Sequence, residues 1–334
     1  MLRRTQGIAT IFFIILLQAC SGSGGGGGSQ QPPAQPPPSG ANPQLLLTAS
    51  NYQTVLKVSV GTSMTAFNYV KLSGDMAASL LNLPILLAQS IFPCPDGGLT
   101  WLDIDDRNAD GFFNVGDYVN QAYDHCETDG SMIDGIIRIE LKSVTPKDGG
   151  LQIEVFATIV GLTLKLPNPS IGQLTINFLG PVLYTSTPAY EQFQLAGASF
   201  SSGTTASADN ATALYVDFTQ NHASGDYQLM FGGSVDSAGL GGKFEYSTFT
   251  PFTGTIGQFP TRGRLLAAGR ENSTARLSEE GAAANNDSAV FVAVDSNGDS
   301  VTDASVSEFA WGDIAPRQLF DAFNNQAVAL PGTP

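Results

Sequence analysis

The alternation of hydrophobic and polar positions along most of the chain predicts β-strands. From residue 129 onward, short apolar runs are separated by clusters of glycine, proline, asparagine and aspartate, which is the pattern of antiparallel strands joined by turns. The expected strands cover residues 99–104, 118–123, 136–141, 151–159, 162–166, 174–178, 190–195, 213–218, 227–232, 244–248, 261–268 and 290–294. The sequence therefore predicts a mainly β fold with an antiparallel, curved sheet, open barrel or sandwich.

An N-terminal segment of the domain carries the different spacing of a helix. In residues 45–72, apolar side chains recur at three- and four-residue steps and form one stripe. The stripe comprises Tyr52, Val55, Leu56, Val60, Met64 and Phe67. We expect this helix to pack on one face of the sheet and to end at Gly74 and Asp75. Residues 76–90, which include Pro84, are expected to form a broken helix or a buried crossing segment.

An acidic loop lies between the expected strands 99–104 and 118–123. Oxygen-bearing side chains occupy positions one, three, five, nine and twelve of twelve residues, with Gly111 at position six. They are Asp106, Asn108, Asp110, Asn114 and Asp117. This spacing resembles the calcium loop of EF-hand proteins, and its letters are most similar to the dockerin version. The resemblance implies that these side chains and the carbonyl of Phe112 bind calcium.

Two features separate this loop from the families that it resembles. Strands rather than helices are expected on both sides, and no second good copy follows, so neither a dockerin module nor a cohesin partner is implied. The alternative interpretation is an Asx-rich surface loop that satisfies its own backbone amides.

A weaker acidic motif occurs near the C-terminus. Asp295, Asn297 and Asp299 repeat the first three positions of the loop, but Ser300 replaces the glycine and Val306 stands at position twelve. The Asn297-Gly298 pair is also typical of a tight β-hairpin turn. A simple turn and a weak second cation site are therefore both retained as interpretations.

The N-terminus has the pattern of an export signal. Arg3 and Arg4 precede an apolar run over residues 8–17, which is about ten residues long and too short to span a bilayer as a helix. Residues 17–20, Leu-Gln-Ala-Cys, resemble the lipobox of bacterial lipoproteins. The resemblance implies acylation of Cys20 and a lipid-bilayer partner, and Ser21 after the cysteine favours anchoring to the outer membrane of the bacterial cell envelope.

The remaining chain divides by composition. After the signal at residues 1–20, residues 21–44 are rich in glycine, proline, glutamine and serine and are expected to form a disordered linker. Residues 45–334 are expected to form the β-rich globular domain, either as one unit or as two subdomains with a boundary near residues 170–200. With Cys20 acylated, Cys94 and Cys126 remain and are expected to form a disulfide in an oxidising compartment. Two separate buried thiols are the alternative.

The acidity of the chain and the motifs that it lacks limit the functions that we expect. The chain has 15 Lys and Arg against 30 Asp and Glu and no basic run, so nucleic-acid binding is not expected. His125 and His222 are expected to be ordinary surface residues. The sequence contains no nucleophile elbow, zinc-protease, P-loop or dinucleotide-binding motif. We therefore expect a non-catalytic binding or structural domain, with a carrier of lipid or another apolar ligand and a glycan-acting enzyme as alternatives.

Overall fold

The computed structural model describes residues 43–81, 83–85, 90–128, 131–165, 173–203, 208–280 and 289–314. All fourteen strands of this part belong to one antiparallel sheet, and each strand pairs with its neighbour in sequence. The strands are β1 Ser90–Pro93, β2 Gly97–Asp105, β3 Tyr118–Thr128, β4 Ser131–Lys147, β5 Gly150–Lys165, β6 Gln173–Ser186, β7 Tyr190–Gly203, β8 Ala208–Asn221, β9 Asp226–Ser237, β10 Gly242–Thr255, β11 Arg262–Ala268, β12 Thr274–Glu280, β13 Ala289–Asp295 and β14 Ala304–Ala310. The predicted fold class, a mainly β protein with an N-terminal helix on a curved antiparallel sheet, is confirmed.

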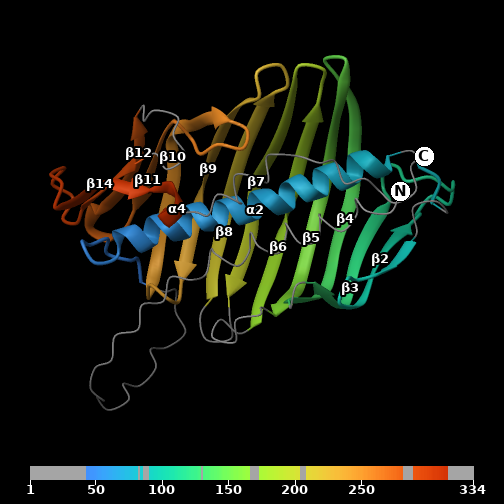
Figure 1. The fold of residues 1–334 in the computed structure, drawn as a ribbon, viewed down its shortest axis with the longest axis horizontal. Helices are drawn as coiled ribbons and strands as arrows, with labels where there is room; N and C mark the ends of the chain where they lie inside the picture. The colour runs from blue at the N-terminus through green and yellow to red at the C-terminus, as the bar shows by residue number, and fades with distance from the viewer. Residues whose placement is uncertain are drawn as a thin grey trace, which may run out of the picture.

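One long helix, α2 Tyr52–Leu80, crosses this sheet (Figure 1). Its 29 residues span roughly 43 Å at the usual helical rise. The helix packs against the strands from β4 to β9 and from β11 to β13, and it also touches the short helix α4 Trp311–Ile314. A single helix therefore covers the concave face of most of the sheet.

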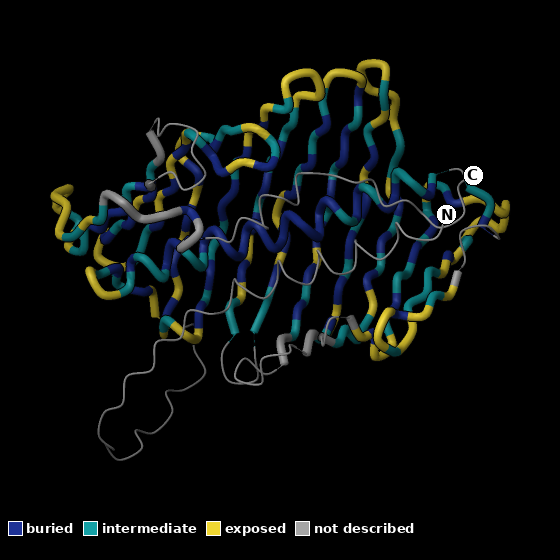
Figure 2. Tube along the Cα trace, in the orientation of Figure 1, coloured by how far each residue is buried: buried dark blue, intermediate teal, exposed yellow. Residues whose placement is uncertain are grey.

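The helix is buried on nearly all sides, although several of its side chains are polar (Figure 2). The hydroxyls of Ser59, Thr65 and Ser73 each donate to the carbonyl four residues earlier, at 2.7 to 2.8 Å. Ser63 shares a hydrogen bond of 2.8 Å with the hydroxyl of Tyr246 on β10. Because a buried hydroxyl is costly only when it lacks a partner, these bonds allow the polar positions of the helix to enter the core.

The prediction that Gly74 and Asp75 end the helix is wrong, and so is the prediction of a separate broken helix from residue 76. The helix continues through both positions to Leu80. A Cβ atom at Gly74 would lie 3.1 Å from side-chain atoms of Tyr184 and Phe193, so this glycine lets the helix approach the sheet closely. Asp75 is paired with Lys71 at 2.7 Å. Both residues therefore have a packing role inside the helix.

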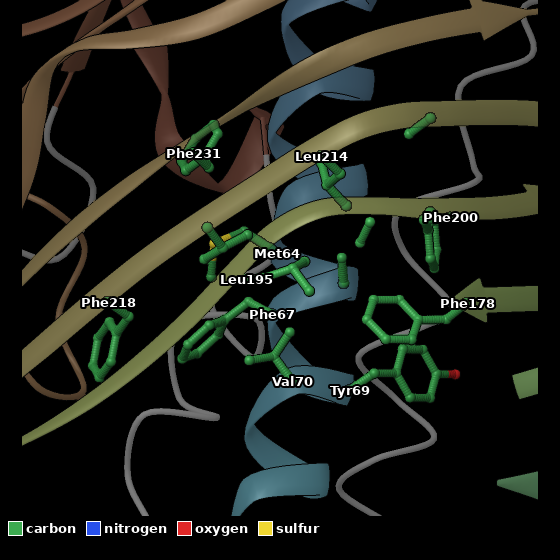
Figure 3. Close-up of a cluster of buried hydrophobic side chains, with 14 of the residues drawn as sticks. Met64, Phe67, Tyr69, Val70, Phe178, Leu195, Phe200, Leu214, Phe218 and Phe231 are labelled. Carbon is green, nitrogen blue, oxygen red and sulfur yellow. The ribbon is translucent and has the colours of Figure 1, made fainter. Parts of the chain in front are cut away.

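The core between helix and sheet is rich in aromatic side chains (Figure 3). The ring of Phe67 on α2 lies 4.9 Å from that of Phe218 on β8 and 6.0 Å from that of Phe193 on β7. Further along the sheet, Trp311 of α4 packs edge-on against Phe252 of β10 with their ring centres 5.6 Å apart. Such rings bury large apolar areas, which fixes the position of the helix on the sheet.

Several strands are longer than their hydrophobic pattern predicts, because bulges interrupt the alternation. Residues 151–159 and 162–166 were expected as two strands but belong to the single strand β5. Between them, Val160 and Gly161 lie opposite Asn177 alone in the pairing with β6. A bulge of this kind inserts an extra residue and shifts which side chains face the core. The period-two pattern therefore breaks although the strand continues.

The ordered domain begins slightly before the expected end of the linker. Pro43 and Gln44, the last residues of the predicted linker, lie against Lys243 at the start of β10. The predicted signal, Cys20 and the linker up to residue 42 lie outside the described residues. Strands β6 and β7 pair from Thr175 to Ser186, so the sheet is continuous through the region that was considered as a subdomain boundary. None of the helices in the described part of the chain has the length and apolar character needed to cross a membrane.

We expect the stability of the fold to depend on the Lys71–Asp75 ion pair in the core. The Lys71 side chain is 8% exposed and that of Asp75 is 17% exposed, and burial is the main cause that raises the pKa of Asp75 above its usual value. Lys71→Met leaves the carboxylate without its cation and should lower the free energy of unfolding by about 3 kcal/mol, as measured by urea denaturation. The double variant Lys71→Met/Asp75→Leu should regain most of this loss. Equal stability of Lys71→Met and the unmodified protein would contradict the assignment.

Candidate metal centre

The acidic loop joins β2 to β3 at one end of the sheet, and it is fixed to the fold at several points. Phe113 within the loop is fully buried in the core. The amide of Phe113 donates to the carbonyl of Leu83, and the amide of Ile85 donates to the carbonyl of Gly111. The expected strand–loop–strand arrangement is confirmed. The chain before β1 thus holds the loop from one side while the two strands hold its ends.

The first half of the loop is organised by hydrogen bonds from its own backbone. Asp106 Oδ2 accepts from the amide of Gly111 at 2.8 Å. Asn108 Oδ1 accepts from the amide of Asp110 at 3.0 Å, and Asp110 Oδ1 accepts from the amide of Phe112 at 2.9 Å. The backbone turns at Ala109 and Gly111, which have φ values of 57° and 83°. These bonds and turns direct the side chains at positions one, three and five inward.

The residue at position twelve closes the loop. Asp117 is completely buried, and each of its carboxylate oxygens accepts one backbone amide at 2.9 Å, from Arg107 and from Asn114. Its own backbone continues the pairing with Leu141 on β4. Asp117 therefore ties the beginning and the end of the loop together, in addition to any role as a ligand.

The Asn114 side chain links three other positions of the loop by hydrogen bonds. Its Nδ2 donates to Asp110 Oδ2 at 2.5 Å and to the carbonyl of Phe112 at 3.3 Å, and its Oδ1 accepts from Asn108 Nδ2 at 2.8 Å. Asp106 Oδ1 is buried and has no hydrogen-bond partner. Carboxylate, amide and carbonyl oxygens in one short loop, one of them unsatisfied, are the kind of donors that a hard cation such as calcium takes.

The nearest cationic side chains are held away from these oxygens. The guanidinium groups of Arg107 and Arg138 stack on the ring of Tyr118, at 4.5 and 3.9 Å from its centre. Both lie near Asp105, at 3.6 and 3.8 Å from its Oδ2. Within the described ranges, these ion pairs at the loop involve Asp105 and not Asp106 or Asp110. The charge of the inner carboxylates is therefore not neutralised by an arginine.

The second acidic loop joins β13 to β14 and reproduces the local geometry of the first. Asp295 Oδ2 accepts from the amide of Ser300, Asn297 Oδ1 from that of Asp299, and Asp299 Oδ1 from that of Val301, at 2.7 to 2.9 Å. These are the same positions as in the first loop. Positions four and six again have positive φ, 75° at Gly298 and 68° at Ser300. The two loops therefore share this pattern of turns and hydrogen bonds over their first seven residues.

Asn297-Gly298 lies in the loop of the β13–β14 hairpin, but this loop is longer than a tight turn, because β13 ends at Asp295 and β14 begins only at Ala304. Asp303, at position nine, takes the closing role that Asp117 has in the first loop. It accepts hydrogen bonds from the backbone amide and the hydroxyl of Ser296, and these bonds lower the pKa of Asp303 below its usual value. Sequence spacing missed Asp303 because the expected ligand position was residue 306.

The predicted disulfide between Cys94 and Cys126 is confirmed, with the two Cα atoms 5.4 Å apart. It connects the segment after β1 to β3 and encloses the entire acidic loop. A crosslink and a well-ordered loop thus restrain the same end of the sheet.

A further group of potential metal ligands was not predicted. Asp124, His125 and Asp134 bring one carboxylate, one imidazole and a second carboxylate to within 4.8 Å of one another. No sequence spacing indicates this group, since Asp134 comes from a neighbouring strand.

The chain was compared with known proteins. It matches no family model, no curated protein and no solved structure.

We expect the disulfide to contribute measurably to stability. The two cysteines are separated by 32 positions, and closing a loop of this length stabilises a fold by roughly 3–4 kcal/mol in the chain-entropy model. Cys94→Ser/Cys126→Ser should lose about this much in urea denaturation. The unmodified protein in reductant should show the same loss, whereas the double variant should not respond to reductant. A response of the double variant would contradict the assignment.

Proposed function

We propose that this chain is a lipid-anchored protein of the bacterial outer membrane, with a non-catalytic binding or structural domain that is stabilised by calcium. The proposal rests on one observation above the others. The oxygens of Asp106, Asn108, Asp110 and the Phe112 carbonyl are gathered in one rigid loop, and Asp106 Oδ1 is buried there without a partner.

Calcium fits this loop better than the alternative of a self-satisfied Asx loop. Such a loop pairs its side-chain oxygens with its own amides, and the Asp106 loop does so with one oxygen at each of positions one, three and five. The second oxygen of Asp110 also accepts from Asn114, but that of Asp106 is buried without a partner. Calcium takes about six to eight oxygens, and it would satisfy these atoms together.

The second loop supports a weaker calcium site of the same kind. Asp295, Asn297 and Asp299 share the turns and hydrogen bonds of the first loop, but Val306 provides no ligand at position twelve. The two loops lie within the hairpins β2–β3 and β13–β14, near the two ends of the open sheet. Cations at both places would stiffen the least supported strands of the fold.

The cellular location is inferred from the signal and the cysteines. The lipobox-like residues 17–20 place an acylated cysteine ahead of a segment that is long enough to separate the domain from a membrane. A disulfide-bonded protein is typical of an oxidising compartment, and extracellular calcium sites of modest affinity fill in such compartments.

The two alternative functions have less support. A carrier of an apolar ligand needs an internal cavity, but α2 and its aromatic contacts occupy the concave face of the sheet, so a ligand there would have to displace the helix. A glycan-acting enzyme needs two catalytic carboxylates across a cleft. The outer face has an open groove of about 510 Å³ that Glu154 and Asp217 help to line. Asp217, however, holds the side chains of Gln192 and Gln194 at 3.0 Å, which is a structural role.

We expect calcium to raise the thermal stability of the isolated domain. At a concentration about a hundred times the dissociation constant, a bound ion adds roughly 2.7 kcal/mol, which corresponds to a rise of about 4–5 °C in the melting temperature of a domain of this size. Chelated protein should be titrated with calcium and, separately, with magnesium, and the melting temperature followed by circular dichroism. Calcium should act at lower concentration than magnesium.

Variants in the two acidic loops test which loop is responsible for the rise in melting temperature that calcium causes. Asp106→Asn/Asp110→Asn should abolish most of the calcium response, and Asp295→Asn should reduce any weaker second phase. Asp148→Asn, in the tight turn between β4 and β5, removes one carboxylate charge, as each single substitution in the loops does, and should leave the response unchanged. An unaltered melting temperature in calcium, or a response that survives both loop variants, would refute the calcium proposal.

The anchor is tested separately from the metal. We expect the full-length chain, expressed in a bacterium with an outer membrane, to incorporate a palmitate analogue and to sediment with that membrane. Cys20→Ser should remove the label and release the protein, whereas Cys94→Ser/Cys126→Ser should retain the label. Labelling that persists in Cys20→Ser would contradict the proposed anchor without affecting the calcium proposal.

A further inference from the structure

The Asp124, His125 and Asp134 group is built by an irregularity in the pairing of β3 with β4. Tyr123 pairs with Gly135 and Cys126 pairs with Ile133. Between these pairs, Asp124 and His125 on β3 lie opposite Asp134 alone on β4. The three potential ligands are therefore all of the residues of one β-bulge, a feature that redirects side chains and often adjoins functional sites.

The potential ligand atoms of His125, Asp124 and Asp134 already lie close to one another. His125 Nδ1 is 2.6 Å from Asp124 Oδ1 and 3.4 Å from Asp134 Oδ2. Tetrahedral zinc, with bonds of about 2.0–2.2 Å to nitrogen and oxygen, places its ligand atoms roughly 3.2–3.5 Å apart. The 3.4 Å distance to Asp134 thus matches this geometry, and the 2.6 Å distance to Asp124 would have to lengthen by less than about 1 Å. The side chains are 68%, 57% and 41% exposed for His125, Asp124 and Asp134, so a further coordination position faces solvent.

The bulge is held firmly in this conformation. His125 has a φ of 49°, a left-handed value that is uncommon for residues other than glycine. On β2, a Cβ atom at Gly98 would lie only 2.0 Å from the carbonyl oxygen of His125, so the two backbones are in close contact. The next residue, Cys126, is fixed by the disulfide to Cys94. The contact with Gly98 and the disulfide therefore hold the backbone of His125 in place.

His125 lies near more negative charge than a single ion pair would place there. The carboxylates of Asp124, Asp134 and Glu127 surround its imidazole. A protonated imidazole neutralises only one of these carboxylates. A dication would balance two of them, and it would take the place of the proton on Nδ1.

We propose that Asp124, His125 and Asp134 bind a divalent transition-metal ion of the zinc type, with an open position for water or another ligand. The imidazole distinguishes this site from the two acidic loops, because calcium prefers oxygen ligands alone whereas zinc binds nitrogen and carboxylate oxygen together. The proposal does not depend on calcium in either loop. The metal crosslinks β3 to β4 beside the disulfide.

The test is a zinc titration of the intact domain at pH 8 in saturating calcium, followed by isothermal calorimetry and native mass spectrometry. A single zinc ion should bind with saturation. His125→Gly removes the ligand at a backbone conformation that glycine adopts readily, and it should weaken zinc binding by about tenfold or more. Asp134→Asn should weaken binding with less change to the backbone. His222→Ala removes the other histidine of the chain and should leave zinc binding unchanged.

Nuclear magnetic resonance of the unmodified protein provides a measurement that needs no variant. Zinc should shift the ring nitrogen resonances of His125 and leave those of His222 in place. The absence of saturable binding, a shift at His222 alone, or equal affinity in His125→Gly and the unmodified protein would each overturn the proposal. Displacement of zinc by calcium at similar concentrations would also overturn it, since it would indicate a site selective for oxygen-binding cations.

Discussion

The structure depends on the burial of one helix against one very wide sheet. Fourteen strands in sequence order form an open surface, and such a surface is stable only if its apolar face is covered. Helix α2 meets this requirement almost alone, since it reaches from β4 to β13. Its internal hydroxyl hydrogen bonds, the close approach at Gly74 and the Lys71–Asp75 pair are the local conditions that let a partly polar helix lie in an apolar environment.

The sequence predicts much of this arrangement because periodicity reports burial directly. The apolar stripe from Tyr52 to Phe67 identified the helix, and alternation identified the sheet. The errors have physical causes. Helix termination was predicted at Gly74 because propensity disfavours glycine within helices, but tertiary packing against Tyr184 and Phe193 outweighs that preference. Strand β5 was divided in two because a bulge at Val160 and Gly161 reverses the faces of the residues that follow.

The two kinds of candidate metal site differ in whether the sequence alone reveals their ligands. The ligands of an acidic loop lie within twelve residues, and the spacing of Asp106, Asn108 and Asp110 is therefore readable without a structure. The bulge group joins His125 to Asp134 through the register of two strands. Register is set by the pattern of the whole sheet, so no local spacing reveals it. The position-nine role of Asp303 was missed for a related reason, since the second loop closes three residues earlier than the first.

The neighbour-to-neighbour order of the strands has a consequence for how the chain reaches its native state. Each hairpin forms from adjacent sequence, which favours rapid local assembly. The helix, however, is synthesised before every strand that shelters it, and the last of these strands, β13, comes more than two hundred residues later. The apolar surface of the helix therefore stays partly exposed to solvent while the hairpins of the sheet are synthesised one after another. The nascent protein is thus most vulnerable to aggregation early, and protection by a chaperone matters most before the later hairpins arrive.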